Sequence, residues 1–380
     1  PLLRARLFRL GEHRHVLLLV MHAAASDCAS MRLLARELMA LLAGRSLPPV
    51  PFQFADFAAW QHERLERAPE LLEAWRERLA DDPPPLALPP DRPRTAVRKF
   101  RCASLRAGLP ADLWGALQAL AQREQATPFM VLAAGFLLLL SRTGGRSDLV
   151  LGVPVPGRVL PEVEDVVGPF GNTLPLRIQV EQAEPVRGFL ARVREAWLDA
   201  LSGQEVPAAR LLDVLPLKRD PCFPRLFQTS LTLLDPERPL PGPPGFEISS
   251  EPFHGGHAHV ELALTFREAG GGLEGSLDYD PDLFDQTTPV RFLDRLARLY
   301  RGMAEAPDTP VGCLPRLDDR ESRELEGMAS TRPGQEGLLH VLVAQQAARN
   351  PEAVAFEEPD RRLTYGALDR DADRLAHALL

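Results

Sequence analysis

Apolar and polar residues alternate weakly from Leu2 to Leu10, and a continuous apolar run follows from Val16 to Val20. The turn-forming residues 11–13 lie between these two stretches, and this order predicts a β-hairpin. The run from Val16 to Val20 is typical of a strand that is buried on both faces. Apolar residues then recur with helical spacing from Met31 to Leu42, which predicts an amphipathic helix after a short loop with polar side chains.

The later part of the chain switches repeatedly between helical and strand patterns. We expect helices over residues 54–79, 110–121, 129–142 and 285–303, and strands over residues 100–109, 148–154, 258–268 and 273–279. Three glycines at 270–272 predict a hairpin with a loose loop between the last two strands.

Two stretches have the composition of linkers. Prolines crowd residues 81–95, and proline is excluded from helix interiors and central strands, so we place an inter-lobe linker at residues 83–99. Residues 304–335 are polar and punctuated by proline and glycine, which predicts a second linker. These boundaries divide the chain into residues 1–82, residues 100–303 and a final segment, 336–380.

Composition narrows the class of protein. The formal net charge is -8 and the pI is near 5.7, which leaves no basic surface for nucleic acid. The longest apolar run, Phe129 to Leu140, is shorter than the roughly 20 residues of a membrane span. The four cysteines are scattered and form no CxxC pair, which is typical of reduced cytosolic thiols. We therefore expect a cytoplasmic protein that contacts neither nucleic acid nor membrane.

Two other ligand classes have little support in the residues. Residues 144–147 lack the GxxxxGK[ST] pattern of a phosphate-binding loop. His254, His257 and His259 lie among glycines, which is compatible with a metal site or with a loop that enters the next strand. We favour the loop, and we expect no metal, because no carboxylate partners are evident.

The loop before the first helix carries the candidate chemistry. Its residues 22–28 resemble the HHxxxDG signature of condensation domains from nonribosomal peptide synthetases. His22 and Asp27 match the first histidine and the aspartate of that signature. The second histidine, which the family uses at its reaction centre, is replaced by Ala23, and the glycine is replaced by Cys28.

Further blocks strengthen the resemblance because they occur in the order of the family. Residues 54–60, 152–158, 167–173, 219–228 and 277–284 resemble the family's YADYAVW, GTPVAGR, IGFFVNT, RDxSRxPLFQ and LEYNTDLF elements. Residues 203–209 depart from the family's HQDxPFE element, because its His, Phe and Glu are absent. Residues 336–380 resemble the opening of an adenylation domain.

The resemblance implies an α/β (α+β) fold. Two chloramphenicol-acetyltransferase-like lobes would form a V with a central tunnel, residues 1–82 being a partial N-terminal lobe and residues 100–303 the C-terminal lobe. The chain starts at Pro1 and ends within a helical pattern, so we expect it to be a piece of a longer synthetase. Upstream and downstream peptidyl carrier domains would deliver 4'-phosphopantetheine arms, and the chain itself would bind no cofactor.

The implied reaction is attack of a carrier-bound amine on a carrier-bound thioester. Orientation of the two reactants can contribute about 7–11 kcal/mol, and acid–base assistance adds about 10²–10⁴-fold. The methyl group of Ala23 cannot supply that assistance, so we expect an impaired condensation domain. The alternative is a noncatalytic docking, recruitment or spacer domain. A stand-alone acyltransferase that uses coenzyme A is disfavoured by residues 336–380.

The remaining candidates each have a structural alternative. Asp27 would pair with Arg158 of the second lobe, as in the family, or cap the helix as Ser26 or Ser30 also could. His22 is expected to be structural, and Cys28 unreactive because the adjacent carboxylate disfavours a thiolate. Asn172 would face the tunnel and bind a substrate amide, or act as a turn asparagine.

Overall fold

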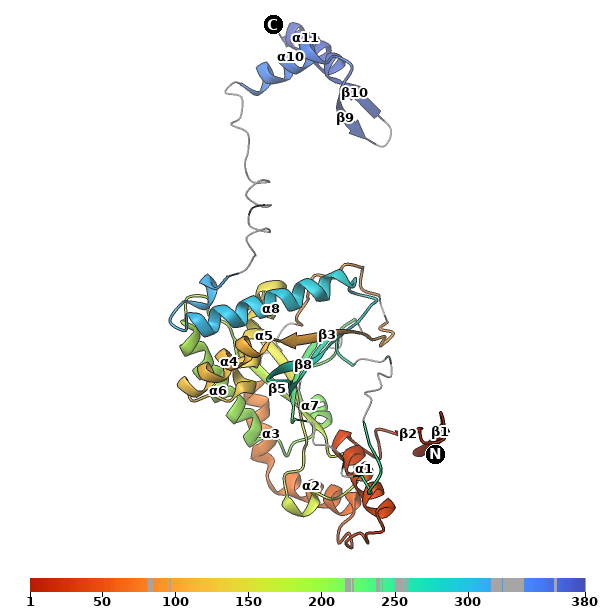
Figure 1. The fold of residues 1–380 in the computed structure, drawn as a ribbon. Coiled ribbons are helices and arrows are strands. Elements are labelled where there is room, and N and C mark those ends of the chain that lie inside the picture. Colours follow the sequence, from red (N-terminus) through yellow and green to blue (C-terminus); the bar gives the residue numbers. More distant parts are fainter. Residues whose placement is uncertain are drawn as a thin grey trace. The chain divides into compact units, whose positions relative to one another are not determined.

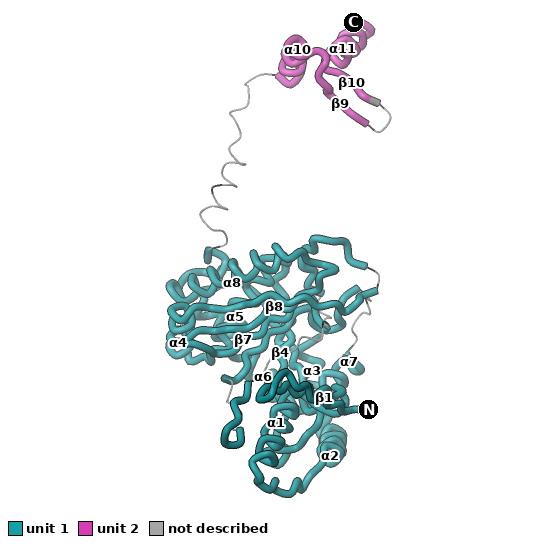
Figure 2. The backbone as a smooth tube through the Cα atoms, turned by 45° about the vertical axis from the view of Figure 1, so that its right-hand side comes forward, with its two compact units in different colours: residues 1–316 teal, residues 317–380 magenta. Residues whose placement is uncertain are grey.

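The computed structural model describes residues 1–80, 85–95, 97–215, 220, 222–236, 240, 242–249, 256, 259–315, 323, 338–358 and 361–379. The chain divides into two compact units, residues 1–316 and residues 317–380 (Figure 2). Each unit is described by itself.

The first unit contains eight of the described strands and most of the described helices. The strands are β1 (Leu3–Arg9), β2 (His15–Met21), β3 (Ala103–Leu109), β4 (Asp148–Val155), β5 (Asn172–Gln179), β6 (Thr229–Leu234), β7 (Leu262–Ala269) and β8 (Gly272–Tyr279). The helices are α1 (Cys28–Leu42), α2 (Phe54–Arg67), α3 (Pro69–Arg78), α4 (Ala111–Arg123), α5 (Pro128–Gly144), α6 (Val186–Ser202), α7 (Ala208–Val214) and α8 (Thr287–Glu305), with short 3-10 turns at Pro161–Val163 and Val311–Cys313.

A six-stranded sheet with the order β3-β8-β7-β6-β4-β5 forms the centre of this unit (Figure 1). The β4–β6 and β6–β7 pairs are parallel, and the other pairs are antiparallel. Helix α5 is buried from Met130 to Ser141, because its apolar residues surround the helix instead of forming one stripe. Helices α4, α6 and α8 pack against α5, and the buried Tyr300 hydroxyl of α8 donates to the Leu132 carbonyl at 2.8 Å.

No single helix among the described residues is long and apolar enough to cross a membrane. Helices α4 and α5 pass the test of length and composition only as a pair that is bent by 106°.

The N-terminal hairpin is confirmed, but the expected burial of its second strand is wrong. Strands β1 and β2 pair antiparallel, with Arg9 opposite His15 at the turn. Val16, Leu17 and Val20 nevertheless keep 42–49% of their surface exposed. The physical reason is that β2 pairs only with β1 in the described part of the chain, so it belongs to a two-stranded ribbon and is not an interior strand of a sheet.

Two other expectations need correction. The helix expected over residues 54–79 breaks at Ala68, because proline at position 69 disfavours helical backbone in the residue before it. Pro69 then occupies the first position of α3, where its missing N–H costs nothing. The loop between β7 and β8 is tight and not loose, since Gly270 and Gly271 both adopt positive φ in a two-residue turn.

Parts of both expected linkers pack onto the core of the first unit. Leu86 and Leu88 are buried, and the Leu86 N–H donates to the Gln228 side chain at 2.7 Å. Arg94 pairs with the fully buried carboxylate of Glu261. Residues 304–315 are likewise attached, with Val311 and Leu314 buried, so the first unit extends to residue 316. The other expected helices and strands of this unit are confirmed within a few residues of their bounds.

The second unit is a small helix–hairpin–helix arrangement. It consists of α10 (Leu339–Arg349), β9 (Val354–Glu358), β10 (Arg361–Thr364) and α11 (Tyr365–Leu379), and the two strands pair antiparallel. Gly366 at the start of α11 donates its N–H to the Pro351 carbonyl at 2.9 Å, which connects α11 to the turn before β9.

Two helical glycines give a matched test of this packing. A Cβ atom at Gly135 of α5 would overlap the ring of Tyr300, whereas Gly115 of α4 has open space around it. Gly135→Ala should therefore destabilise the protein by about 1–3 kcal/mol through overpacking. Gly115→Ala should stabilise it by up to about 1 kcal/mol, because alanine is the better helix former.

Urea titrations followed by tryptophan fluorescence will measure both changes, since all four tryptophans lie in the first unit. A neutral or stabilising Gly135→Ala would contradict the packing of α5 against α8.

Candidate functional site

The loop that joins β2 to α1 presents residue 23 at the surface. His22 and Ala23 are both exposed. The His22 carbonyl accepts from the Ala25 N–H at 2.9 Å, and its ring atom Nδ1 accepts from the Ala24 N–H at 3.0 Å. The His22 ring thus caps its own turn, and the proton of the neutral ring is assigned to Nε2 because Nδ1 accepts.

Asp27 ends this loop and caps α1. Its Oδ1 accepts from the Ser30 N–H at 2.7 Å, which satisfies a donor of the first helical turn. Its Oδ2 accepts from the Gly171 N–H at 3.1 Å, although 144 residues separate the two in sequence. One carboxylate therefore joins the start of α1 to the segment before β5.

Arg158 reaches the same carboxylate. Its Nη2 lies 3.1 Å from Oδ1 of Asp27, and the two side chains are only 8% and 14% exposed. Nη1 donates to the carbonyls of Val163 and Val166 at 2.8 and 2.7 Å, and the guanidinium lies 4.2 Å from the centre of the Phe170 ring. The cap and the ion pair, which the sequence leaves as alternatives, occur together.

Ser30 is the residue of this cluster whose role the sequence does not reveal. It is fully buried, and its hydroxyl contacts Asp27 Oδ1 at 2.7 Å, the Gly168 carbonyl at 2.8 Å, the Gly168 N–H at 3.0 Å and Arg158 Nη2 at 3.0 Å. From sequence, Ser30 is only one of three possible helix caps. The available signal is its place one turn after Asp27, on the buried face of α1.

Residues 156–171, called here the connecting segment, are held against α2 by apolar contacts. The two elements form an apolar cluster. The connecting segment contributes Val159, Leu160, Val163, Val166 and Phe170, and α2 contributes Phe54, Phe57 and Trp60. Gly168 permits the close approach, because a Cβ atom there would lie 2.6 Å from the Phe54 ring. Apolar packing and the buried polar cluster thus act on the same segment.

The Asn172 amide is fully engaged within the chain. Its Nδ2 donates to the carbonyls of Gln204 and Val206 at 3.1 and 2.8 Å. Its Oδ1 accepts from the N–H groups of Thr173 and Ala208 at 2.9 Å each. Both amide protons are therefore used within the chain, and Asn172 begins β5 instead of lying in a turn.

The altered block at residues 203–209 forms the turn that Asn172 holds. The indole Nε1 of Trp75 donates to the Gly203 carbonyl at 3.0 Å. A Cβ atom at Gly203 would lie 2.5 Å from that nitrogen, so only glycine fits beside this indole. The resemblance leads us to expect histidine at position 203. The glycine found there is the residue that fits beside Trp75.

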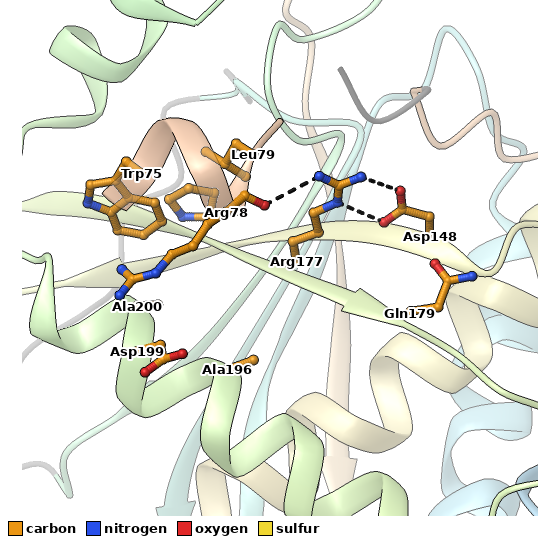
Figure 3. Close-up of a pocket in the computed structure, with 10 residues that line it drawn as sticks. Trp75, Arg78, Leu79, Asp148, Arg177, Gln179, Ala196, Asp199 and Ala200 are labelled. Atoms are coloured by element: carbon orange, nitrogen blue, oxygen red, sulfur yellow. Dashed lines mark hydrogen bonds and ion pairs between the residues drawn. The ribbon is translucent and has the colours of Figure 1, made fainter. Parts of the chain in front are cut away.

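The two described cavities lie away from residue 23. One of about 390 Å³ is flanked by Trp75, Arg78 and Asp199, and Arg177 at its wall pairs with Asp148 at 2.7 Å (Figure 3). The other, of about 230 Å³, lies between Trp114 and Leu234. Neither is lined by Ala23, so a tunnel at this residue stays a prediction.

The other candidates are placed as follows. Cys28 is exposed at the first position of α1. His254 and His257 lie outside the described residues, and the His259 ring lies 6.5 Å from that of Phe100. Within the described ranges, no group of three or more histidine, cysteine or acidic residues is arranged to hold a metal.

Comparison with known proteins identifies the family. The condensation domain family matches residues 1–326. The chain belongs to the condensation domain family.

Curated relatives of this condensation domain are peptide synthetases. The chain is 38% identical over 397 residues to phosphinothricin tripeptide synthetase PhsC of Streptomyces viridochromogenes, covering 100% of this chain and 36% of the relative. It is 37% identical over 394 residues to one of the linear gramicidin synthase proteins of Brevibacillus parabrevis, covering 100% of this chain and 5% of the relative. The chain thus spans about a third or less of these relatives.

Solved structures share the fold. The X-domain from teicoplanin biosynthesis, in its complex with OxyB, superposes with a TM-score of 0.76 at 29% identity, over 84% of this chain and 73% of that one. A four-domain nonribosomal peptide synthetase bound to AMP and glycine gives a TM-score of 0.78 at 22% identity, over 100% of this chain and 30% of that one. At that identity, the second match shows the fold alone.

The buried ion pair gives the sharpest test of the site geometry. Asp27→Asn keeps a good helix cap but leaves the Arg158 charge buried without its partner, which should cost about 3–5 kcal/mol of stability. Asp165→Asn is the control, because it removes an exposed ion pair to Arg36 of 2.6 Å, worth about 0–1 kcal/mol.

The free energies of unfolding of both variants come from the same urea titrations. Equal effects of the two substitutions would contradict the buried ion pair.

Proposed function

We propose that this condensation domain works within a nonribosomal peptide synthetase module, where it joins a carrier-bound acyl or peptidyl thioester to a carrier-bound amino acid. The nucleophilic amine attacks the thioester carbonyl, the new C–N bond forms, and the thiol of the donor arm leaves. The family match over residues 1–326 and the synthetase relatives support this reaction class.

We propose further that the reaction is slow in this domain. The supporting observation is that residue 23 is an exposed alanine on a loop whose end is held by the Asp27–Arg158 pair. A methyl group neither accepts the proton of the attacking amine nor donates to the oxyanion, whereas binding and orientation of the two thioesters do not depend on it. Rate enhancement is then limited to what orientation supplies.

We also propose which domains adjoin this one in the synthetase. Upstream and downstream peptidyl carrier domains would deliver the 4'-phosphopantetheine arms, into a tunnel between two chloramphenicol-acetyltransferase-like lobes. Residues 336–380 would be the start of the adjoining adenylation domain, and the assembly would act in the cytoplasm. The relatives support a place within a longer synthetase, since this chain covers only 36% and 5% of the two relatives named above.

One comparison favours a second function, a noncatalytic recruitment platform. The X-domain of teicoplanin biosynthesis shares 29% identity with this chain, and its structure was solved in a complex with OxyB. We propose that a chain with Ala23 could likewise hold a partner enzyme next to carrier-bound peptide, without forming a bond itself.

Restoring the imidazole separates the two functions. In the full-length synthetase, with both carrier domains loaded, dipeptidyl product is followed by mass spectrometry. Ala23→His should raise the rate by about 10²–10⁴-fold, since acid–base or oxyanion assistance returns. Ala24→His is the matched control, because it places the same ring one residue away in the same exposed turn.

Free imidazole adds an independent readout, because it should accelerate the unsubstituted domain and leave Ala23→His unchanged. An ordinary rate in the unsubstituted domain, or equal gains from the two histidine variants, would contradict an impaired site. Complete absence of product in all three proteins would favour the recruitment platform.

A further inference from the structure

The hydroxyl of Ser30 joins the start of α1 to the connecting segment, beside the Asp27–Arg158 ion pair and the hydrogen bond from Gly171 to Asp27. We infer that Ser30 is a positioning residue, which fixes the loop of residues 22–27 against the connecting segment of residues 156–171. The functional part of this inference rests on the proposed condensation reaction, whereas its structural part does not.

The hydrogen bonds of Ser30 use the full capacity of a hydroxyl. A hydroxyl offers one proton and two lone pairs. The Gly168 N–H and Arg158 Nη2 occupy the lone pairs at 3.0 Å each. The single proton can go to Asp27 Oδ1 at 2.7 Å or to the Gly168 carbonyl at 2.8 Å. No donor or acceptor position of this buried side chain is left over.

Helix capping does not explain these contacts. Asp27 already accepts from the backbone N–H of Ser30, so the capping position of α1 is filled by another side chain. The Ser30 hydroxyl instead reaches a residue 138 positions away, and it does so at full burial. A serine in the first turn that served only the helix would have no need of Gly168.

The location of these bonds gives them a positional effect. Gly168 is three residues before Gly171, which donates to Asp27, and four before Asn172, which starts β5. Ser30 follows residue 23 by seven positions, and Asp27 lies between them. The hydroxyl therefore helps set the distance between the exposed turn at Ala23 and the first residue of β5.

Loss of the hydroxyl has a defined consequence. In Ser30→Ala, the Gly168 N–H loses its partner, and the Arg158 Nη2 keeps only Asp27. A buried donor without a partner is unfavourable, so the connecting segment is expected to move or admit water near Gly168. A displacement of about 1 Å near a reacting group can lower a rate by about 10²-fold.

The test compares Ser30→Ala with Ser26→Ala. The control removes the hydroxyl of Ser26, which lies in the loop before α1 and does not belong to the buried cluster. Each is made in the unsubstituted synthetase and in the Ala23→His protein. Hydrogen exchange by mass spectrometry follows peptides that contain Gly168 and Gly171. Condensation kinetics in the Ala23→His protein give kcat and the KM for the loaded acceptor carrier.

For Ser30→Ala we expect faster exchange at Gly168 and Gly171 and a kcat lowered by about 10–100-fold, with KM changed less than about twofold. Ser26→Ala should leave all three unchanged. Exchange and kcat of Ser30→Ala equal to those of Ser26→Ala would overturn the inference, even if the melting temperature falls.

Two further results are informative. If Ser30→Ala does not fold, Ser30→Cys is measured instead. Because a thiol is a weaker hydrogen-bond partner, exchange at Gly168 and Gly171 should be faster in Ser30→Cys than in the parent protein. Unchanged exchange would overturn the inference. If Ala23→His forms no product, the proposed reaction fails, while the exchange data from the unsubstituted synthetase still decide whether Ser30 holds the connecting segment.

Discussion

The buried ion pair between Asp27 and Arg158 is the constraint on which the site depends. Removing one of the two charges would leave the other buried without a partner, which is unfavourable. The pair therefore holds the start of α1 next to Arg158. The Ser30 hydroxyl accepts a further hydrogen bond from Arg158, and the Gly171 N–H donates one to Asp27. A polar cluster of this kind specifies one arrangement of α1 and the connecting segment more strictly than apolar packing does.

This arrangement separates the scaffold from the chemistry. The contacts that hold the loop involve residues 27 and 30, whereas residue 23, where we propose that the reacting group is missing, has an exposed methyl group. The side chain of residue 23 therefore lies outside the buried cluster. At Gly203, where the resemblance leads us to expect histidine, the Trp75 ring packs so closely that a side chain would not fit. Under the proposed function, a condensation fold would be retained in this way while its catalytic capacity declines.

Much of the local structure follows from the sequence. The all-round apolar pattern of Phe129–Arg142 and the Thr127 cap predict α5, and residues 11–13 predict the first hairpin, because these signals act over a few neighbouring positions. The burial of β2 could not be predicted from its apolar run, since burial depends on what covers the strand. The break at Ala68 could have been predicted from Pro69, but the apolar and aromatic pattern of residues 54–79 indicated one continuous helix.

The site was predictable only in part, because its contacts are long-range. The motif resemblance pointed to Asp27 and Arg158, yet nothing local in the sequence relates Ser30 to Gly168 or Asn172 to the turn at 204–208. Both side chains have short-range alternatives, a helix cap and a turn, that the residue types favour equally. Only the tertiary structure shows which partners their polar atoms take.

A double-mutant cycle on Asp27→Asn and Arg158→Met tests the central claim most directly, because it measures the coupling free energy of the pair and not the effect of either substitution alone. The coupling comes from urea unfolding of the four proteins, with Arg36→Met and Asp165→Asn as the exposed reference cycle. A buried pair predicts a coupling of about 1–3 kcal/mol that clearly exceeds the reference. Additivity of the Asp27 and Arg158 substitutions within about 0.3 kcal/mol would contradict the account.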